Sequence, residues 1–138
     1  MKDNMKVVLV DADESFRMML RQMIEAAGDF EVAGSVGNGA EAWRIIAREC
    51  PQLVVMDVIL PELDGFGLLD RLASMAARPR AILVSAFCQG QMVKRAMKQG
   101  AEAFIPKPCE MEELLGQMRR AAQRAEEENA RDAALERL

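Results

Sequence analysis

The chain has 138 residues, a length that fits one domain with a single core. Half of its residues are apolar (51%), 29% are charged and the net charge is −4, so the composition excludes a disordered chain and indicates no basic surface for direct nucleic-acid binding. Histidine is absent, which excludes a Ser-His-Asp triad and a His-ligated metal. Without an apolar run of roughly 18 residues or a signal peptide, we expect a cytoplasmic protein with no membrane partner.

Short apolar runs alternate five times with longer segments of helical periodicity, a pattern that predicts an α/β domain with a parallel sheet flanked by helices. Most of the runs are apolar throughout, as strands covered on both faces are. The expected strands span residues 6–10, 30–33, 53–56, 81–84 and 103–105.

Apolar side chains at helical spacing predict one helix after each strand. These side chains are Phe16, Met19, Leu20, Met23 and Ile24 in the first helix, Ala42, Ile45 and Ile46 in the second, Leu68, Leu69 and Leu72 in the third, Met92, Val93, Ala96 and Met97 in the fourth, and Met111, Leu114, Leu115, Met118 and Ala122 in the fifth. Gly28 is expected to end the first helix, and Asn38 to cap the second. The glycine-rich residues 34–39 lack the GxGxxG order of a dinucleotide site and are expected to form a strand-to-helix turn.

The last residues, 119–138, alternate alanine with arginine and glutamate and contain neither Gly nor Pro, so we expect the fifth helix to continue past the domain. This divides the chain into a domain of residues 1–123 and a charged helical extension or linker of residues 124–138. The extension has no sustained heptad of large apolar residues, so a signalling linker and a solvated helix end that frays both remain open.

Three cysteines, Cys50, Cys88 and Cys109, are widely spaced and form no CxxC pair. An odd number without metal-ligand spacing predicts neither a disulfide framework nor a zinc site. We therefore expect all three to be reduced packing residues.

Polar side chains follow four of the expected strands: Asp11 and Asp13 the first, Asp57 the third, Ser85 the fourth and Lys107 the fifth. In an open parallel sheet the ligand site lies outside the carboxyl ends of the strands. Acids gathered there repel one another unless a cation sits among them, and oxygen ligands suit Mg²⁺. With its charge neutralised by Mg²⁺ and Lys107, a phosphate could be attacked by Asp57, giving an acyl phosphate. Taken singly, each residue has a structural alternative. Asp57 could cap the following loop, Ser85 could hydrogen-bond the backbone, and Lys107 could be a surface charge.

Residues 6–123 resemble the receiver domains of two-component response regulators, the CheY-like family. The stretch VVMDVILPELDG at 54–65 resembles the family's phosphoacceptor segment, and SAF at 85–87 and GAEAFIPKP at 100–108 resemble its other signatures. The resemblance implies a flavodoxin-like doubly wound sheet, (βα)5, of five parallel strands in the order 2-1-3-4-5. It also implies a signalling phosphoprotein rather than an enzyme, with a sensor histidine kinase or a histidine phosphotransfer protein as partner.

By this resemblance Asp57 is the phosphoacceptor, Ser85 the switch hydroxyl, Lys107 the phosphate-binding lysine and Phe104 an aromatic that turns inward on activation. Phosphorylation would draw Ser85 and Lys107 toward Asp57 and alter the face made by the fourth helix, fifth strand and fifth helix. The altered face would favour a homodimer or an output partner. Three structural positions are also implied, the last after a cis peptide bond: Pro61, Gly65 and Pro108.

One position departs from the family. Its members carry two adjacent acids after the first strand, and here Ala12 stands at the second position. We expect Asp11, Asp57 and the carbonyl of Ile59 to bind Mg²⁺, with Asp13 as a further candidate ligand. The missing acid is expected to weaken the metal site.

Three further interpretations follow from particular segments. Residues 85–120 are most similar to the receiver of the sporulation master regulator of Firmicutes, which precedes a DNA-binding domain in transcription regulation. Residues 7–15 also resemble the DxD motif of haloacid-dehalogenase-type phosphatases, with Asp11 as nucleophile and Asp13 as acid/base, although the second acidic pair of those enzymes is not found after Lys107. The third is a phosphate-independent interaction module, which Ala12 would permit.

Overall fold

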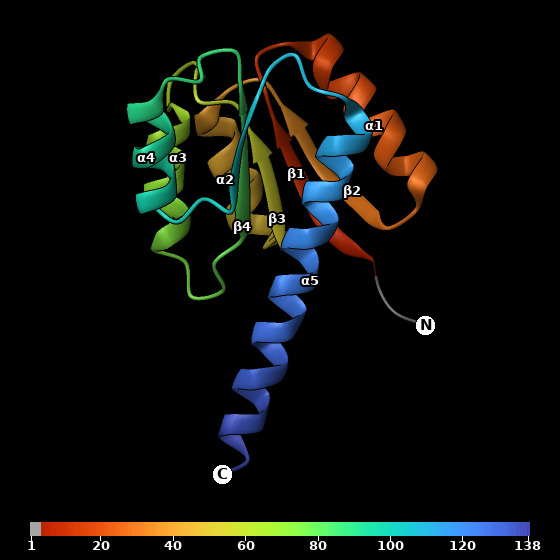
Figure 1. Cartoon of the computed structure of the whole chain (residues 1–138), viewed down its shortest axis with the longest axis vertical. Helices are drawn as coiled ribbons and strands as arrows, with labels where there is room; N and C mark the ends of the chain where they lie inside the picture. The colour runs from red at the N-terminus through yellow and green to blue at the C-terminus, as the bar shows by residue number, and fades with distance from the viewer. Residues whose placement is uncertain (1–3) are drawn as a thin grey trace.

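The computed structural model describes residues 4–138. A single five-stranded parallel sheet has the order β2-β1-β3-β4-β5, which confirms the predicted topology and α/β class. The strands are β1 Met5–Val10, β2 Phe30–Val36, β3 Leu53–Met56, β4 Arg80–Ser85 and β5 Ala103–Pro106 (Figure 1).

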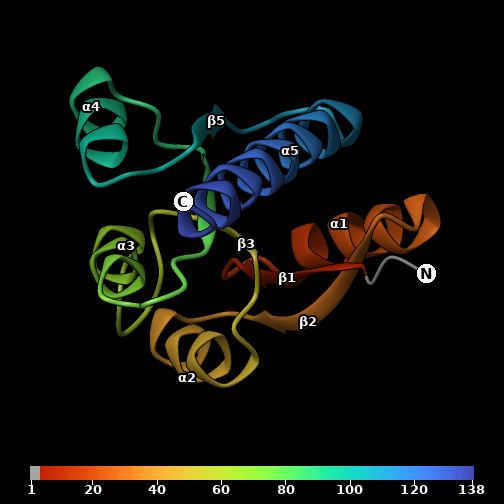
Figure 2. The ribbon, with the colours of Figure 1, turned by 90° about the horizontal axis from the view of Figure 1, so that it is seen from below.

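Five helices alternate with the strands and cover both faces of the sheet. They are α1 Glu14–Ala27, α2 Gly39–Glu49, α3 Gly65–Ala73, α4 Gly90–Lys98 and α5 Met111–Glu136. Seen from below, α1 and α5 lie on one side of the sheet and α2 and α3 on the other (Figure 2). Each side of the sheet therefore has its own apolar layer.

The central strands are apolar throughout because both of their faces are buried. Val8 and Val10 of β1 pack in the layer under α2 and α3, whereas Val7 and Leu9 pack in the layer under α1 and α5. All four side chains are at most 1% exposed. Burying a side chain of this size stabilises the fold by roughly 1.5–3 kcal/mol. The apolar strands therefore contribute to the apolar layers on both faces of the sheet.

The helix ends follow the predicted capping chemistry. The side chain of Asn38 accepts a hydrogen bond from the amide of Glu41 at 2.7 Å, and Gly28 takes the left-handed conformation (φ 80°) that ends α1. Asp13 caps α1 by accepting from the amide of Phe16 at 3.3 Å.

Three sequence expectations are corrected. β2 continues to Val36, so residues 34–36 belong to a strand and the turn is confined to the two residues before α2. Cys50 and Cys88 are exposed rather than packed, because Cys50 is the left-handed cap of α2 (φ 47°) and Cys88 lies in the loop before α4. Met19 and Met97 are 56% and 46% exposed, so the buried stripes of α1 and α4 are narrower than predicted.

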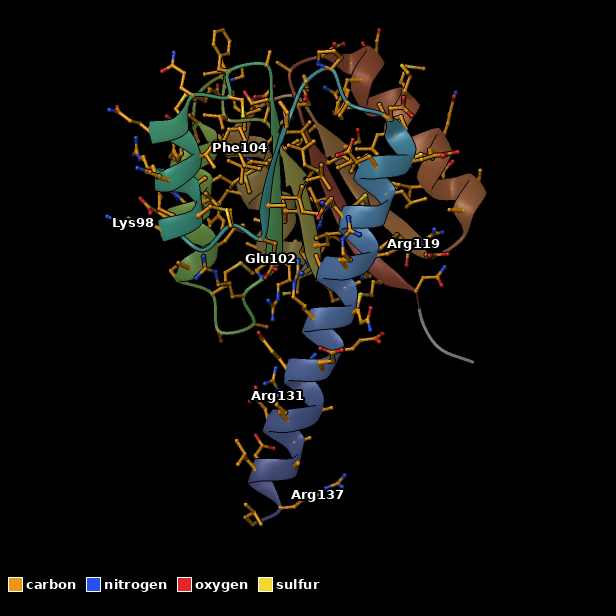
Figure 3. All side chains as sticks on the ribbon, in the orientation of Figure 1. Lys98, Glu102, Phe104, Arg119, Arg131 and Arg137 are labelled. Carbon is orange, nitrogen blue, oxygen red and sulfur yellow. The ribbon has the colours of Figure 1, made fainter. Side chains whose placement is uncertain are left out.

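Helix α5 has 26 residues and projects beyond the sheet; Arg131 lies on the projecting part, and Arg137 directly follows the end of the helix (Figures 1 and 3). The predicted continuation of the fifth helix is thereby confirmed. Ion pairs hold it to the sheet: Glu102 binds Arg80 and Arg124, and Arg80 also binds Glu128. The helix passes residue 123 without a break, and the division of the chain there stays a prediction. Among the described residues, none of the helices combines the length and the apolar character that crossing a bilayer requires.

Candidate functional site

Asp57 follows β3 at the carboxyl edge of the sheet. Its amide donates to the carbonyl of Val10 at 2.9 Å, which continues the pairing of β3 with β1. One carboxylate oxygen, Oδ1, accepts from the amide of Ile59 at 3.1 Å. The side chain is 14% exposed, and its second oxygen, Oδ2, contacts a partner across the edge of the sheet.

That partner is Lys107, which reaches across from the loop after β5. Its Nζ lies 2.6 Å from Oδ2 of Asp11 and 3.2 Å from Oδ2 of Asp57. Asp11 is 4% exposed, and its other oxygen accepts from the amide of Asp13 at 2.9 Å. The structure therefore brings together three of the residues predicted from separate strand ends, with one ammonium shared by two carboxylates.

The two carboxylates change the acid–base behaviour of the lysine. Burial lowers the pKa of Lys107, but hydrogen bonds and charge interactions with Asp11 and then Asp57 outweigh burial, and the net direction is upward. Lys107 therefore stays protonated at neutral pH and compensates the charge of a buried acid.

Ser85 ends β4 and is fully buried. Its hydroxyl accepts from the amide of Phe87 at 3.2 Å, and its carbonyl accepts from the amide of Lys107 at 2.9 Å. Phe104 of β5 pairs with Leu83 of β4 and is partly buried in the layer under α2 and α3 (labelled in Figure 3). The switch candidates Ser85 and Phe104 thus lie on the adjoining strands β4 and β5. A backbone hydrogen bond joins Ser85 to Lys107.

The loop residues implied by the resemblance keep helices close to the site. A Cβ on Gly65 would lie 2.6 Å from the carbonyl oxygen of Asp57, so α3 can approach the backbone of Asp57 this closely only with glycine there. The carbonyl of Pro61 accepts from the amide of Gly39 at 3.2 Å, and the Lys107-Pro108 bond is cis as expected.

The predicted metal ligands differ in what they do. Asp13 uses its carboxylate to cap α1, and Ile59 directs its amide toward Asp57. Within residues 4–138, no group of three or more acidic, cysteine or histidine side chains is arranged to hold a metal. Mg²⁺ commonly binds through one or two carboxylates with water and phosphate oxygens completing its shell. Asp11 and Asp57 fit that donor set, and Asp13 as a ligand stays a prediction.

Sequence reasoning missed three residues that shape the site. Phe16 was assigned only to the core, yet Nζ of Lys107 lies 4.3 Å from the centroid of its ring. Arg17 donates to the backbone carbonyl of Asp11 and, at 3.1 Å, to the hydroxyl of Ser35. Gly39 is pressed so closely against the loop before α3 that a Cβ would lie 1.7 Å from a backbone oxygen. Only their nearness in sequence to Asp11 or to a predicted cap could have drawn attention to them.

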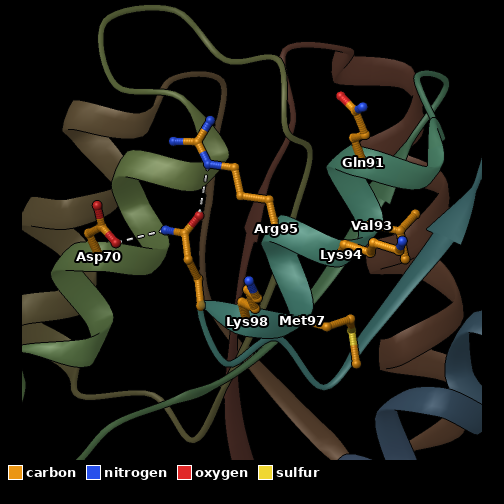
Figure 4. Close-up of a pocket in the computed structure, with 8 residues that line it drawn as sticks. Asp70, Gln91, Val93, Lys94, Arg95, Met97 and Lys98 are labelled. Carbon is orange, nitrogen blue, oxygen red and sulfur yellow. Dashed lines mark hydrogen bonds between the residues drawn. The ribbon is translucent and has the colours of Figure 1, made fainter.

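A concavity away from the strand ends lies along α4, where it meets α3 (Figure 4). There the side chain of Gln99 donates to Asp70 at 2.7 Å and accepts from Arg95 at 3.2 Å. Arg95 also lies over the ring of Phe66, 4.2 Å from its centroid. These contacts fasten α4 to α3, and none of them involves the acidic cluster at the strand ends.

Comparisons with known proteins agree with this geometry. The family model described as response regulator receiver domain matches residues 7–119. The chemotaxis protein CheY of Bacillus subtilis (strain 168) is 36% identical over 110 residues, which cover 80% of this chain and 91% of that protein. The response regulator domain of Thermotoga maritima CheB is 28% identical with a TM-score of 0.79 and covers 86% of this chain and 96% of that one.

A CheY-like receiver domain protein from Methanospirillum hungatei JF-1 shares the fold. Its TM-score is 0.85 at 24% identity, with 91% of this chain and 99% of that chain covered. The narrower likeness to the sporulation regulator's receiver is not supported by these comparisons and stays a prediction.

Proposed function

The chain belongs to the response regulator receiver domain family, and on that premise we propose that phosphorylation of Asp57 switches it between two states. The observation that carries the proposal is the ammonium of Lys107 shared between Asp57 and Asp11 at 3.2 and 2.6 Å. A lysine in that position binds the oxygens of a phosphoryl group attached to Asp57.

The reaction starts with Oδ2 of Asp57 as the nucleophile. It attacks phosphorus of the donor, a P–O bond forms, and the donor's leaving group departs with the bonding electrons. Lys107 moves part of its contact from the carboxylates to the phosphoryl oxygens and offsets their charge. A magnesium ion held by Asp11, Asp57 and the carbonyl of Ile59 would supply further positive charge to those oxygens.

The switch works through the backbone link between Ser85 and Lys107. A phosphoryl group adds nearly two negative charges, which attract the hydroxyl of Ser85 and the ammonium of Lys107. Movement of Ser85 opens space for the partly buried Phe104 on the neighbouring strand. The face of α4, β5 and α5 then changes, and with it the affinity for a second copy or an output partner.

Membership of the receiver family also indicates the partners of this chain and its place in the cell. Receiver domains are signalling phosphoacceptors that take the phosphoryl group from a histidine kinase or a phosphotransfer protein, and we assign the same partner classes here. The chain takes part in its own phosphorylation without turning over a substrate. A cytoplasmic location and a linker role for residues 124–138 belong to the same proposal.

The phosphatase interpretation gives the catalytic roles to Asp11 and Asp13, the acids after β1. It needs Asp11 as nucleophile and Asp13 as acid/base, yet Asp11 is 4% exposed, and the carboxylate of Asp13 caps α1. Asp57 is the more exposed of the two carboxylates on Lys107, with side chains 14% and 6% exposed. The geometry therefore favours Asp57.

The test is uptake of one phosphoryl group from acetyl phosphate in the presence of Mg²⁺, measured by intact mass with Trp43 fluorescence as a second signal. We expect uptake by the wild type and by the control Asp132→Asn, loss in Asp57→Asn, and loss on adding EDTA. Uptake that survives Asp57→Asn but not Asp11→Asn would support the phosphatase interpretation. No uptake at any Mg²⁺ concentration would support the phosphate-independent module.

A further inference from the structure

The ammonium of Lys107 has a third neighbour besides its two carboxylates. Its Nζ lies 4.3 Å from the centroid of the Phe16 ring, well inside the roughly 6 Å over which a ring face attracts a cation. Asp11 and Asp57 directly follow β1 and β3, whereas Phe16 lies on α1. The lysine is therefore held from three separate elements.

Phe16 is held by a hydrogen bond of its own amide and by the contacts of the next residue, Arg17. Its amide donates to the carboxylate of Asp13 at 3.3 Å. The next residue, Arg17, donates to the carbonyl of Asp11 and to the hydroxyl of Ser35. The loop after β1 and the first turn of α1 thus form one unit, and the ring keeps a constant relation to Asp11.

The backbone of Lys107 is held by a hydrogen bond of its own, separate from the contacts of the ammonium. Its amide donates to the carbonyl of Ser85 at 2.9 Å, and its side chain is 18% exposed. Between the backbone and the ammonium runs a flexible four-carbon stem with many rotamers. Contacts of the ammonium itself therefore decide whether it lies beside Asp57 or turns toward solvent.

We propose that Phe16 is a positioning residue for Lys107, its ring face holding the ammonium beside Asp57 before a phosphoryl group arrives. The proposal rests on the proposed function, since it needs Lys107 to bind phosphate. A neutral ring has an advantage over another acid in this position. It attracts the ammonium without adding a negative charge that would repel the incoming phosphate.

Phe16 also packs against the apolar layer under α1 and α5, so the experiment must separate packing from positioning. Phe16→Leu removes the ring and keeps an apolar side chain, and Phe16→Tyr keeps the ring. Met23→Ala is the control for lost packing, because Met23 is partly buried in the same layer on the same helix. We expect Phe16→Leu to slow phosphorylation by acetyl phosphate about threefold to tenfold, Tyr to stay within about twofold of wild type, and Met23→Ala to leave the rate unchanged.

A double-mutant cycle with Lys107→Met tests whether Phe16 acts through the lysine. In the Lys107→Met background, Phe16→Leu should have no further effect on the rate. An equal slowing in both backgrounds, or an unchanged rate in Phe16→Leu alone, refutes the positioning role while the proposed function stands. A wild type that takes up no phosphoryl group refutes the proposed function and the positioning role with it.

The placement of the ammonium can also be measured without phosphorylation. Protons on the ε-methylene of Lys107 should be shifted upfield by the ring current of Phe16, in wild type and in Phe16→Tyr. The shift should disappear in Phe16→Leu and persist in Met23→Ala. Ordinary lysine shifts in the wild type would overturn the proposal, because the ring would then not lie over the ammonium.

Discussion

Replacing Lys107 with methionine removes the ammonium shared by Asp11 and Asp57 and keeps most of the aliphatic stem. The two carboxylates are then left facing each other at the edge of the sheet, with side chains only 6% and 14% exposed. We expect the variant to be less stable than wild type at neutral pH in the absence of divalent metal.

The size of the loss follows from the geometry. Both carboxylate oxygens contact one nitrogen atom, at 2.6 and 3.2 Å, so they lie less than about 6 Å apart. Two unit charges at that distance repel by roughly 3 kcal/mol at an effective dielectric constant of about 20. The free energy of unfolding should therefore fall by about 2–4 kcal/mol, in line with the cost of removing one partner of a buried ion pair.

Urea unfolding monitored by circular dichroism, in EDTA at neutral pH, measures this difference. Lys98→Met is the matched control, because Lys98 is exposed on α4 (Figure 3) and the same change there should cost little. Mg²⁺ should recover part of the loss in Lys107→Met and none in the control, since a bound cation offsets the same repulsion.

Two results would refute this reasoning. A Lys107→Met protein within about 0.5 kcal/mol of wild type in EDTA would mean that the carboxylates are not held by the lysine. An equal loss in Lys98→Met would mean that the effect is a general one of losing positive charge from an acidic protein.

Three other predictions concern different parts of the molecule. Gly39→Ala should lower the free energy of unfolding in urea by about 2 kcal/mol or more, because its Cβ would lie 1.7 Å from the carbonyl oxygen of Leu63; an unchanged midpoint would contradict the close approach. Glu128→Gln should cost less than about 1 kcal/mol, since the Glu128 side chain is 54% exposed, yet speed amide exchange in residues 124–138; unchanged exchange would show that its pair with Arg80 does not order the extension. Because the pKa of Lys107 is raised in the folded state, the protonated lysine stabilises the fold fully at any pH below its ordinary pKa of 10.5. That stabilisation is lost as the pH rises through the folded pKa. The stability difference between wild type and Lys107→Met should therefore stay constant from neutral pH to about pH 10 and shrink only above it; a difference that vanishes by about pH 9 contradicts this.

The fold was predictable because its signals are local. Apolar runs with no polar break, such as residues 53–56, indicate strands covered on both faces, and the capping role of Asn38 needs only its neighbour Glu41. The order of the strands is not local, and its prediction came from the family resemblance. The extra length of β2 was missed because residues 34–36 carry Gly and Ser, which are typical of turns, and pairing with β1 overrides that preference.

The site was predictable in part for the same reason. Asp11, Asp57 and Lys107 follow apolar runs, and the carboxyl ends of parallel strands meet at one edge of the sheet. The use made of Asp13 could not be predicted in this way. Its carboxylate could ligate a metal or cap a helix, and only the start of α1 at Glu14 places the amide of Phe16 within reach of it.

The sequence alone determined the alternation of strands and helices and the set of polar groups at the strand ends, because period and position along the chain carry that information. The packing of elements against one another decided the rest: which acids share the ammonium of Lys107, that Phe16 lies over it, and that Gly39 admits no larger side chain. These contacts join residues from different elements at distances of a few ångströms. Such distances depend on how helices pack on the sheet, and no pattern within a single segment specifies them.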